Sequence, residues 1–273
     1  HIASGPEKNE DLMFKKGCLK IGLIDGSSSQ ATAAVSEEYL TGGKGSLLMT
    51  REEVEDLVVR GHERGFQVTA HVLGDTAMEI MLDAFDKAYK KMPRTDCRHR
   101  IEHAFIGRED LILRMKEMKI SPVCNTVFFY EMGEIYQKHY TTRQQEQMIP
   151  LKDYLDAELS CALGTDWSVC DINPMFGIYA AMTRKTSSGD LIGEKQGISL
   201  MDALKMYTIN GAYLSFEEKI KGSITPGKLA DVIILSKDIA NADPEEIPSI
   251  GIDMTVIDGQ IVYCNDKETE AAK

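Results

Sequence analysis

The chain has 273 residues, of which 43% are hydrophobic and 27% charged, proportions that exclude a predominantly disordered protein. Acidic residues outnumber basic ones by 43 to 31, and the net charge of −12 argues against a surface that binds nucleic acid or an anionic membrane. The six cysteines form no Cys-x-x-Cys pair, and no uncharged stretch approaches the roughly 18 residues of a membrane span, so we expect a cytoplasmic protein with free thiols.

Predicted strands and helices alternate along the first part of the chain. The apolar residues 18–24 predict a strand, and the small polar residues 28–45 predict an ordered loop. A capping box at residues 50–53 begins a helix. Residues 66–72 predict a second strand, and residues 76–91 predict a long helix with large apolar side chains at helical spacing.

The alternation continues through three more strands. We expect these strands at residues 99–104, 120–128 and 161–165, and helices at residues 109–118, 153–158, about 173–184 and 199–212. Five strand–helix units in succession predict an α/β fold, with a parallel sheet and crossover helices, over residues 18–216.

The two ends of the chain differ from this central part. Residues 1–17 are polar and charged, and we expect a tag or linker segment there. Residues 217–273 are expected to form a β-rich portion, in which Asp258-Gly259 is a hairpin turn. Its strands are expected at residues 231–235, 253–257 and 260–263.

Four polar side chains lie within or directly after the predicted strands, namely Lys20, His71, His103 and Asp166. Ligands of parallel α/β folds bind at the carboxyl ends of the strands, so these groups are expected to converge. Imidazole and carboxylate together suit Zn²⁺, Mn²⁺ or Fe²⁺ better than Ca²⁺ or Mg²⁺. Each residue also has a structural interpretation: an edge-strand lysine, hydrogen-bonded core histidines, and an aspartate that caps the following segment.

Other polar residues near these strands are weaker candidates. Glu102, beside His103, is expected to point to the opposite face of its strand and to be structural. His62 lies on a charged helix face and is expected to be solvated. His99 begins a strand, and His139 is expected in a polar loop.

Taken with their neighbours, these residues resemble the family-3 branch of the metal-dependent amidohydrolase superfamily. The first set of motifs is LKIGLIDGS at 19–27, HVLGD at 71–75, IEH at 101–103 and LGTDW at 163–167. Further similar segments are NPMFGIYAAMTR at 173–184, YTINGA at 207–212 and GSITPGKLAD at 222–231. The resemblance covers most of residues 18–262, and the order and spacing of the motifs make it specific.

The resemblance implies a fold. Members of the superfamily have a (β/α)₈ TIM-type barrel beside a small β-sandwich. Residues 18–216 would then be a partial barrel, supplying about strands 4–8, and residues 217–273 would supply the C-terminal strands of the sandwich.

The resemblance also implies roles for the four candidate residues. Lys20 would be carboxylated and bridge two metal ions, and His71 and His103 would bind one of them. Asp166 would be both a metal ligand and the catalytic residue that orients a metal-activated hydroxide and accepts its proton. The metal would be Zn²⁺, with Mn²⁺ or Fe²⁺ as alternatives.

One motif of the branch is missing. Its members carry His-x-His on the first barrel strand, and this sequence contains none. The chain therefore resembles the C-terminal portion of a longer hydrolase of carbon–nitrogen bonds in amides, formamides or cyclic amides, and we expect it to be inactive alone. An alternative is a truncated, non-catalytic half-barrel that acts as a binding or regulatory module. Open sheet edges would favour homo-oligomers in that case.

The resemblance implies a small-molecule substrate and neither a nucleic-acid nor a membrane partner. Residues 130–136 are expected to form a loop after the fourth predicted strand, and this loop, with Tyr130 in it, could line the pocket together with Trp167 and Asp75. Alternatively, the aromatic side chains pack beneath a lid.

Overall fold

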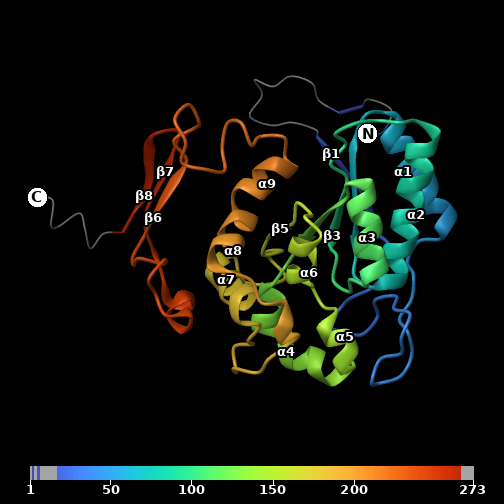
Figure 1. The fold of residues 1–273 in the computed structure, drawn as a ribbon, viewed down its shortest axis with the longest axis horizontal. Helices are drawn as coiled ribbons and strands as arrows, with labels where there is room; N and C mark the ends of the chain where they lie inside the picture. Colours follow the sequence, from blue (N-terminus) through green and yellow to red (C-terminus); the bar gives the residue numbers. More distant parts are fainter. Residues whose placement is uncertain (1, 3–4, 7–16, 266–273) are drawn as a thin grey trace, which may run out of the picture.

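The computed structural model describes residues 2, 5–6 and 17–265, so most of the predicted segment 1–17 lies outside the described residues. All five predicted strands of the central part form, and they make one sheet (Figure 1). The strands are β1 (Cys18–Leu23), β2 (Gln67–Val72), β3 (Arg100–His103), β4 (Ser121–Cys124) and β5 (Ala162–Leu163). Neighbouring strands run parallel in the order β1-β2-β3-β4-β5, so their carboxyl ends lie at one edge of the sheet.

Helices connect these strands, as the alternating pattern predicts. They are α1 (Arg51–Glu63), α2 (Asp75–Lys91), α3 (Glu109–Met118), α4 (Val127–His139), α5 (Thr142–Glu146), α6 (Leu151–Asp156), α7 (Pro174–Thr183), α8 (Leu200–Tyr207) and α9 (Ile209–Leu214). The predicted capping box is confirmed, because the Thr50 hydroxyl accepts from the Glu53 amide while the Glu53 carboxylate accepts from the Thr50 amide.

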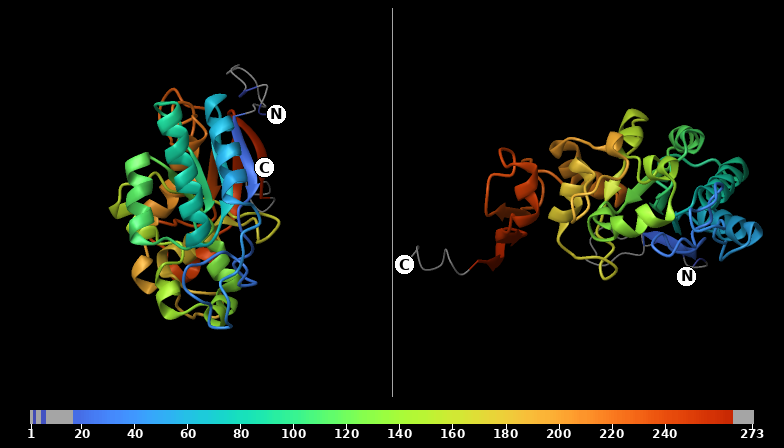
Figure 2. Two further views of the ribbon diagram at one scale, coloured as in Figure 1. Left: turned by 90° about the vertical axis from the view of Figure 1, so that its right-hand side faces the viewer. Right: turned by 90° about the horizontal axis from the view of Figure 1, so that it is seen from below.

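The core forms where the first three helices meet the sheet. Helices α1, α2 and α3 pack side by side (Figure 2), and Val58 and Phe85 are fully buried on their inner faces. Val68 and Ile101 on the facing strands are fully buried as well. Burying such a side chain contributes about 1.5–3 kcal/mol, so this packing fixes the strands that carry the polar residues.

The fourth strand is shorter than predicted. It ends at Cys124, and α4 follows almost directly. The apolar run that suggested a longer strand continues at helical spacing, with Phe129 and Gly133 buried four residues apart. Residues 130–136 and His139, which were expected in loops, therefore belong to α4.

The helix expected over residues 199–212 is divided in two. The backbone breaks at Thr208, where φ is −122° and ψ is −91°. Asn210, in the second piece, donates from Nδ2 to the Cys161 carbonyl at 2.7 Å. This bond links α9 to the residue before β5.

A separate antiparallel sheet follows, and its predicted hairpin is confirmed. It consists of β6 (Val232–Leu235), β7 (Ile252–Ile257) and β8 (Gln260–Cys264), with Asp258 and Gly259 at φ of 49° and 75° in the turn. The short helix η3 (Pro244–Ser249) packs on α7, where the Tyr179 hydroxyl donates to Glu245 at 2.8 Å. Another short helix is η2 (Glu194–Gln196). Among the described helices, none is long and apolar enough to cross a membrane.

Candidate metal centre

Three of the four predicted ligands meet at the carboxyl ends of β2, β3 and β5. His71, His103 and Asp166 line one cavity of about 360 Å³. The two imidazole rings are 4.6 Å apart between centroids and lie edge to face. The rest of the lining consists of Leu23, Gly26, Ser27, Ser28, Ser29, Thr32, Leu73, Phe128, Met132 and Val169.

The fourth predicted ligand lies outside this cavity. Lys20 is exposed on β1, opposite Thr69 in the parallel register. Its ammonium group is still close enough to lower the pKa of Asp166. Partial burial has the larger, opposite effect, so the pKa of the Asp166 carboxyl is raised above its usual value.

Hydrogen bonds determine which nitrogen of each histidine is free. His71 Nε2 lies 2.8 Å from the Gly26 carbonyl, which can only accept, so this nitrogen carries the proton. His103 Nδ1 lies 2.8 Å from Asn125 Oδ1. His71 Nδ1 and His103 Nε2 are therefore left as lone-pair donors.

His103 is also held neutral. Burial lowers the pKa of His103 to about 3, and the nearby His71 contributes in the same direction. A neutral imidazole is the form that binds a metal ion, so the ring is prepared for coordination at neutral pH.

A buried carboxylate supports this arrangement and was not among the predicted site residues. Asp25 is fully buried and accepts hydrogen bonds from the amides of Ala34, Leu73 and Gly74 at 2.7–3.0 Å. It also lies 4.0 Å from His71 Nε2. Asp25 thus joins the end of β1, the loop after it and the end of β2. The Asp-Gly turn directly after a strand was the signal for it in the sequence.

The predicted orientation of Glu102 is wrong. Glu102 pairs in register with His71 and accepts a hydrogen bond from the Thr69 hydroxyl at 2.8 Å, so it shares the face of the sheet that carries His71. Simple alternation fails because the backbone turns at the end of β3, where His103 and Ala104 have φ of 73° and 42°. That turn brings the imidazole back toward the cavity.

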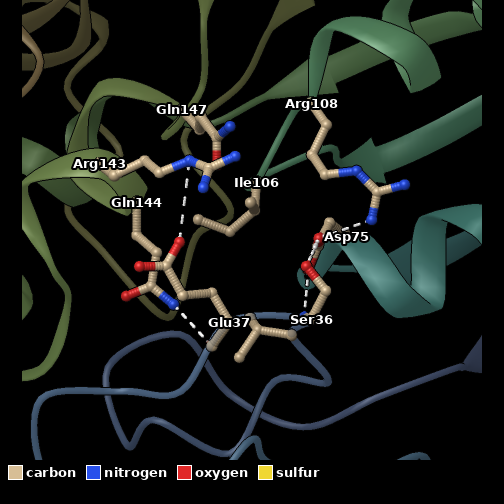
Figure 3. A pocket seen from close by; sticks show the side chains of 9 residues that line it. Ser36, Glu37, Asp75, Ile106, Arg108, Arg143, Gln144 and Gln147 are labelled. Carbon is tan, nitrogen blue, oxygen red and sulfur yellow. Dashed lines mark hydrogen bonds and ion pairs between the residues drawn. The ribbon is translucent and has the colours of Figure 1, made fainter.

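The three predicted substrate contacts are not among the residues that line this cavity. Tyr130 stacks on Phe176 at 4.6 Å between ring centroids, and Trp167 is 69% exposed directly after Asp166. Asp75 lines a second cavity of about 320 Å³ (Figure 3).

In the second cavity, the Asp75 carboxylate is hydrogen-bonded and ion-paired to neighbouring residues. Its carboxylate accepts from the Ser36 amide at 2.8 Å, from the Ser36 hydroxyl and from the Arg108 guanidinium at 2.9 Å (Figure 3). On the far side of the cavity, Arg143 lies 3.8 Å from Glu37. The charges of this cavity are paired, so Asp75 anchors the loop after β1.

Part of the apolar wall of the first cavity comes from α4 and from the segment after β5. Phe128 and Met132 lie on α4, and Val169 follows β5. The Phe128 ring stacks on His103 with 5.8 Å between centroids. Met132 lies within the segment 130–136 that was expected at the pocket, whereas Phe128 was missed because it was predicted to lie in a strand.

A second group of potential ligands lies elsewhere in the core. His62, Cys97 and His99 offer ligand atoms within 4.8 Å of one another, and all three are buried. The expectation that His62 is solvated is therefore wrong. Its helix packs its apolar side on the core, and the imidazole is carried in with it.

Both ring nitrogens of His62 and both ring nitrogens of His99 take part in hydrogen bonds. His99 Nδ1 accepts from the Val68 amide at 2.9 Å, so the His99 proton is on Nε2, which donates to His62 Nδ1 at 2.9 Å. His62 Nε2 then donates to the Met92 carbonyl at 2.7 Å. Neither ring keeps a free lone pair, so the pair is a neutral structural element.

This buried pair is expected to make stability depend on pH. Burial, with the nearby His62 and Arg94, lowers the pKa of His99 to about 3, below its unfolded value of about 6.5. The unfolded chain therefore binds more protons, and stability falls as pH drops below about 6.5. Between pH 6.5 and 5, His99 should lower the free energy of unfolding by about 2 kcal/mol.

The measurement is urea unfolding at several pH values with a chelator present. A His99→Asn variant keeps an acceptor for the Val68 amide and should lose about this much of the pH dependence. An unchanged slope in the variant would contradict the prediction.

A model of the amidohydrolase family matches residues 5–263. An N-substituted formamide deformylase of Arthrobacter pascens is 28% identical over 255 residues, which are 93% of this chain and 47% of that protein. The chain spans about half the length of the curated relatives it matches.

Solved structures resemble the fold. An uncharacterized metal-dependent hydrolase from Pyrococcus furiosus superposes with a TM-score of 0.69 at 25% identity, covering 82% of this chain and 44% of that one. Another from Pyrococcus horikoshii gives a TM-score of 0.76 at 24% identity, covering 89% of this chain and 49% of that one.

Proposed function

Because this chain belongs to the amidohydrolase family, in its family-3 branch, we propose that it forms the C-terminal part of a metal-dependent hydrolase of carbon–nitrogen bonds. The sheet β1–β5 would be about strands 4–8 of a (β/α)₈ barrel, and β6–β8 would belong to a small β-sandwich. The TM-scores of 0.69 and 0.76 support this placement. The amide chemistry is supported by the name of the formamide deformylase that the chain resembles.

The free nitrogens of His71 and His103 carry the proposal. Each histidine donates the proton of its other ring nitrogen to an oxygen held in place by the protein. This is the usual arrangement around metal-binding histidines. Together with the Asp166 carboxylate, this donor set fits Zn²⁺, with Mn²⁺ or Fe²⁺ as alternatives. Lys20, once carboxylated, would add an oxygen ligand from β1.

When bound, a divalent metal polarises a carbonyl and lowers the pKa of a coordinated water to about 7. The residues of this chain then divide the remaining work. Asp166 would accept a proton from the attacking water and return it to the leaving amine nitrogen. His71 and His103 would hold the metal ion in place. Phe128 would keep bulk water from the ring of His103.

The test combines metal analysis with hydrolysis assays on the full-length protein and on residues 1–273 alone. The full-length protein should contain a transition metal and hydrolyse members of a panel of formamides, amides and cyclic amides. Residues 1–273 alone should hydrolyse none of them, because the expected His-x-His ligands are not in this sequence.

A His103→Gln variant of the full-length protein should lose metal and activity together. His139→Gln, at the end of α4, is the matched control and should keep both. A full-length protein that binds no metal, or that loses metal without losing hydrolysis, would contradict the proposal. The first result would favour a non-catalytic binding module.

A further inference from the structure

We propose that Asn125 is a positioning residue, which sets the proton of His103 and ties this ligand to the segment that carries Asp166. The inference rests on the proposed metal site and names a residue that acts on it from outside. Asn125 follows β4, the strand between those that carry His103 and Asp166. It is 6% exposed, so its polar atoms depend on protein partners.

The orientation of the Asn125 amide follows from its second partner. Nδ2 donates to the Gly164 carbonyl at 3.1 Å, and a carbonyl can only accept. The oxygen must then face His103, where Oδ1 lies 2.8 Å from Nδ1. Because this oxygen cannot donate, His103 must carry its proton on Nδ1 and present Nε2 to the cavity.

The same amide connects two ligands across β4. Gly164, which accepts from Asn125, is two residues before Asp166, and its own amide donates to the Cys124 carbonyl at 2.9 Å. A shift of β5 would therefore change the hydrogen bond that orients His103. His103 is the last residue of β3 and has a φ of 73°, a left-handed backbone conformation that is uncommon for residues other than glycine.

The substitution Asn125→Leu removes both bonds at similar side-chain size. In the metal-free full-length protein, ¹⁵N NMR of the imidazole should show His103 in the Nδ1–H form in the wild type and in a mixture of tautomers in the variant. Competition titration with Zn²⁺ should show an affinity that is about 10–100-fold lower in the variant. A second variant, Asn125→Asp, keeps an acceptor for His103 but not the donor to Gly164, and should preserve the tautomer.

Thr126→Val is the matched control. Thr126 is adjacent and fully buried, and its hydroxyl donates to the Gly177 carbonyl at 2.7 Å. This variant should lose stability while keeping the tautomer and the Zn²⁺ affinity. The proposal is overturned if wild-type His103 carries its proton on Nε2, or if Asn125→Leu and Thr126→Val leave tautomer and affinity equally unchanged. The tautomer is read without metal, so a wild type that binds no Zn²⁺ would count against the proposed function only.

Discussion

Replacing Asp166 by asparagine in the full-length protein is expected to lower kcat by about 10²–10⁴-fold, the usual contribution of a general base. Asparagine keeps an oxygen at the same place but cannot take a proton. His71 and His103 remain, so much of the metal should be retained. The loss should therefore appear in kcat with a smaller change in metal content.

The pH profile offers a second readout of the same substitution. The base must be ionised to act, so wild-type activity should rise with pH until the Asp166 carboxyl is ionised. The Asp166→Asn variant should lack this rise. Asp171→Asn is the matched control, since Asp171 is exposed and accepts only from the Asn173 amide at 2.7 Å. Equal activity of the wild type and the Asp166→Asn variant would exclude Asp166 as the base.

Of the substitutions proposed in this protein, Arg184→Leu should lower the free energy of unfolding the most. Arg184 is fully buried and donates to the carbonyls of Ile192, Ile149 and Met148 at 2.8–3.1 Å, while its guanidinium carbon lies 4.2 Å from the centre of the Phe129 ring. The Ile149 carbonyl keeps a donor, the Leu151 amide at 2.8 Å, so the substitution leaves the carbonyls of Ile192 and Met148 without one, at about 1–3 kcal/mol each. Allowing for partial relaxation, we expect a loss of about 3–5 kcal/mol, a large share of the roughly 5–15 kcal/mol typical of a domain.

Urea unfolding of both proteins measures this difference. Arg184→Lys should lie between wild type and the leucine variant, because an ammonium group reaches fewer of the three carbonyls. Arg143→Leu is the control: its side chain is 75% exposed, and such surface changes usually stay within about 0.5 kcal/mol. A leucine variant at position 184 as stable as the control would show that the carbonyls of Ile192 and Met148 find other partners.

Much of the fold could be predicted from local patterns. The strand–helix alternation, the capping box before α1 and the Asp-Gly hairpin depend on neighbouring residues, and all three are confirmed. The apolar run after β4 was misread because a short buried strand and a buried helix look alike in sequence. The break at Thr208 was not predicted, and Asn210 just after it bonds to Cys161, far away in the chain, a contact that no local pattern contains.

Part of the candidate site could also be predicted from local position along the chain. His71, His103 and Asp166 were found because each stands at a strand end, and strand ends meet in a parallel sheet. Asn125 and Phe128 were not found, because their roles depend on which atoms face His103 in three dimensions.

The attachment of Asp25 has a consequence for changing the specificity of the cavity. Three hydrogen bonds from backbone amides to Asp25 fasten the loop at Ala34 and at the end of β2, whereas Ser27 and Ser29 line the cavity ahead of that anchor. Thr32 lines the cavity too, but its hydroxyl accepts from the Ser27 amide at 2.8 Å and so helps to hold the loop. A combinatorial library confined to Ser27 and Ser29 would vary the polar wall while these hydrogen bonds keep the loop in place. If the loop were replaced by the loop of a relative, the residues that hydrogen-bond to the anchoring carboxylate would have to be transferred together with it.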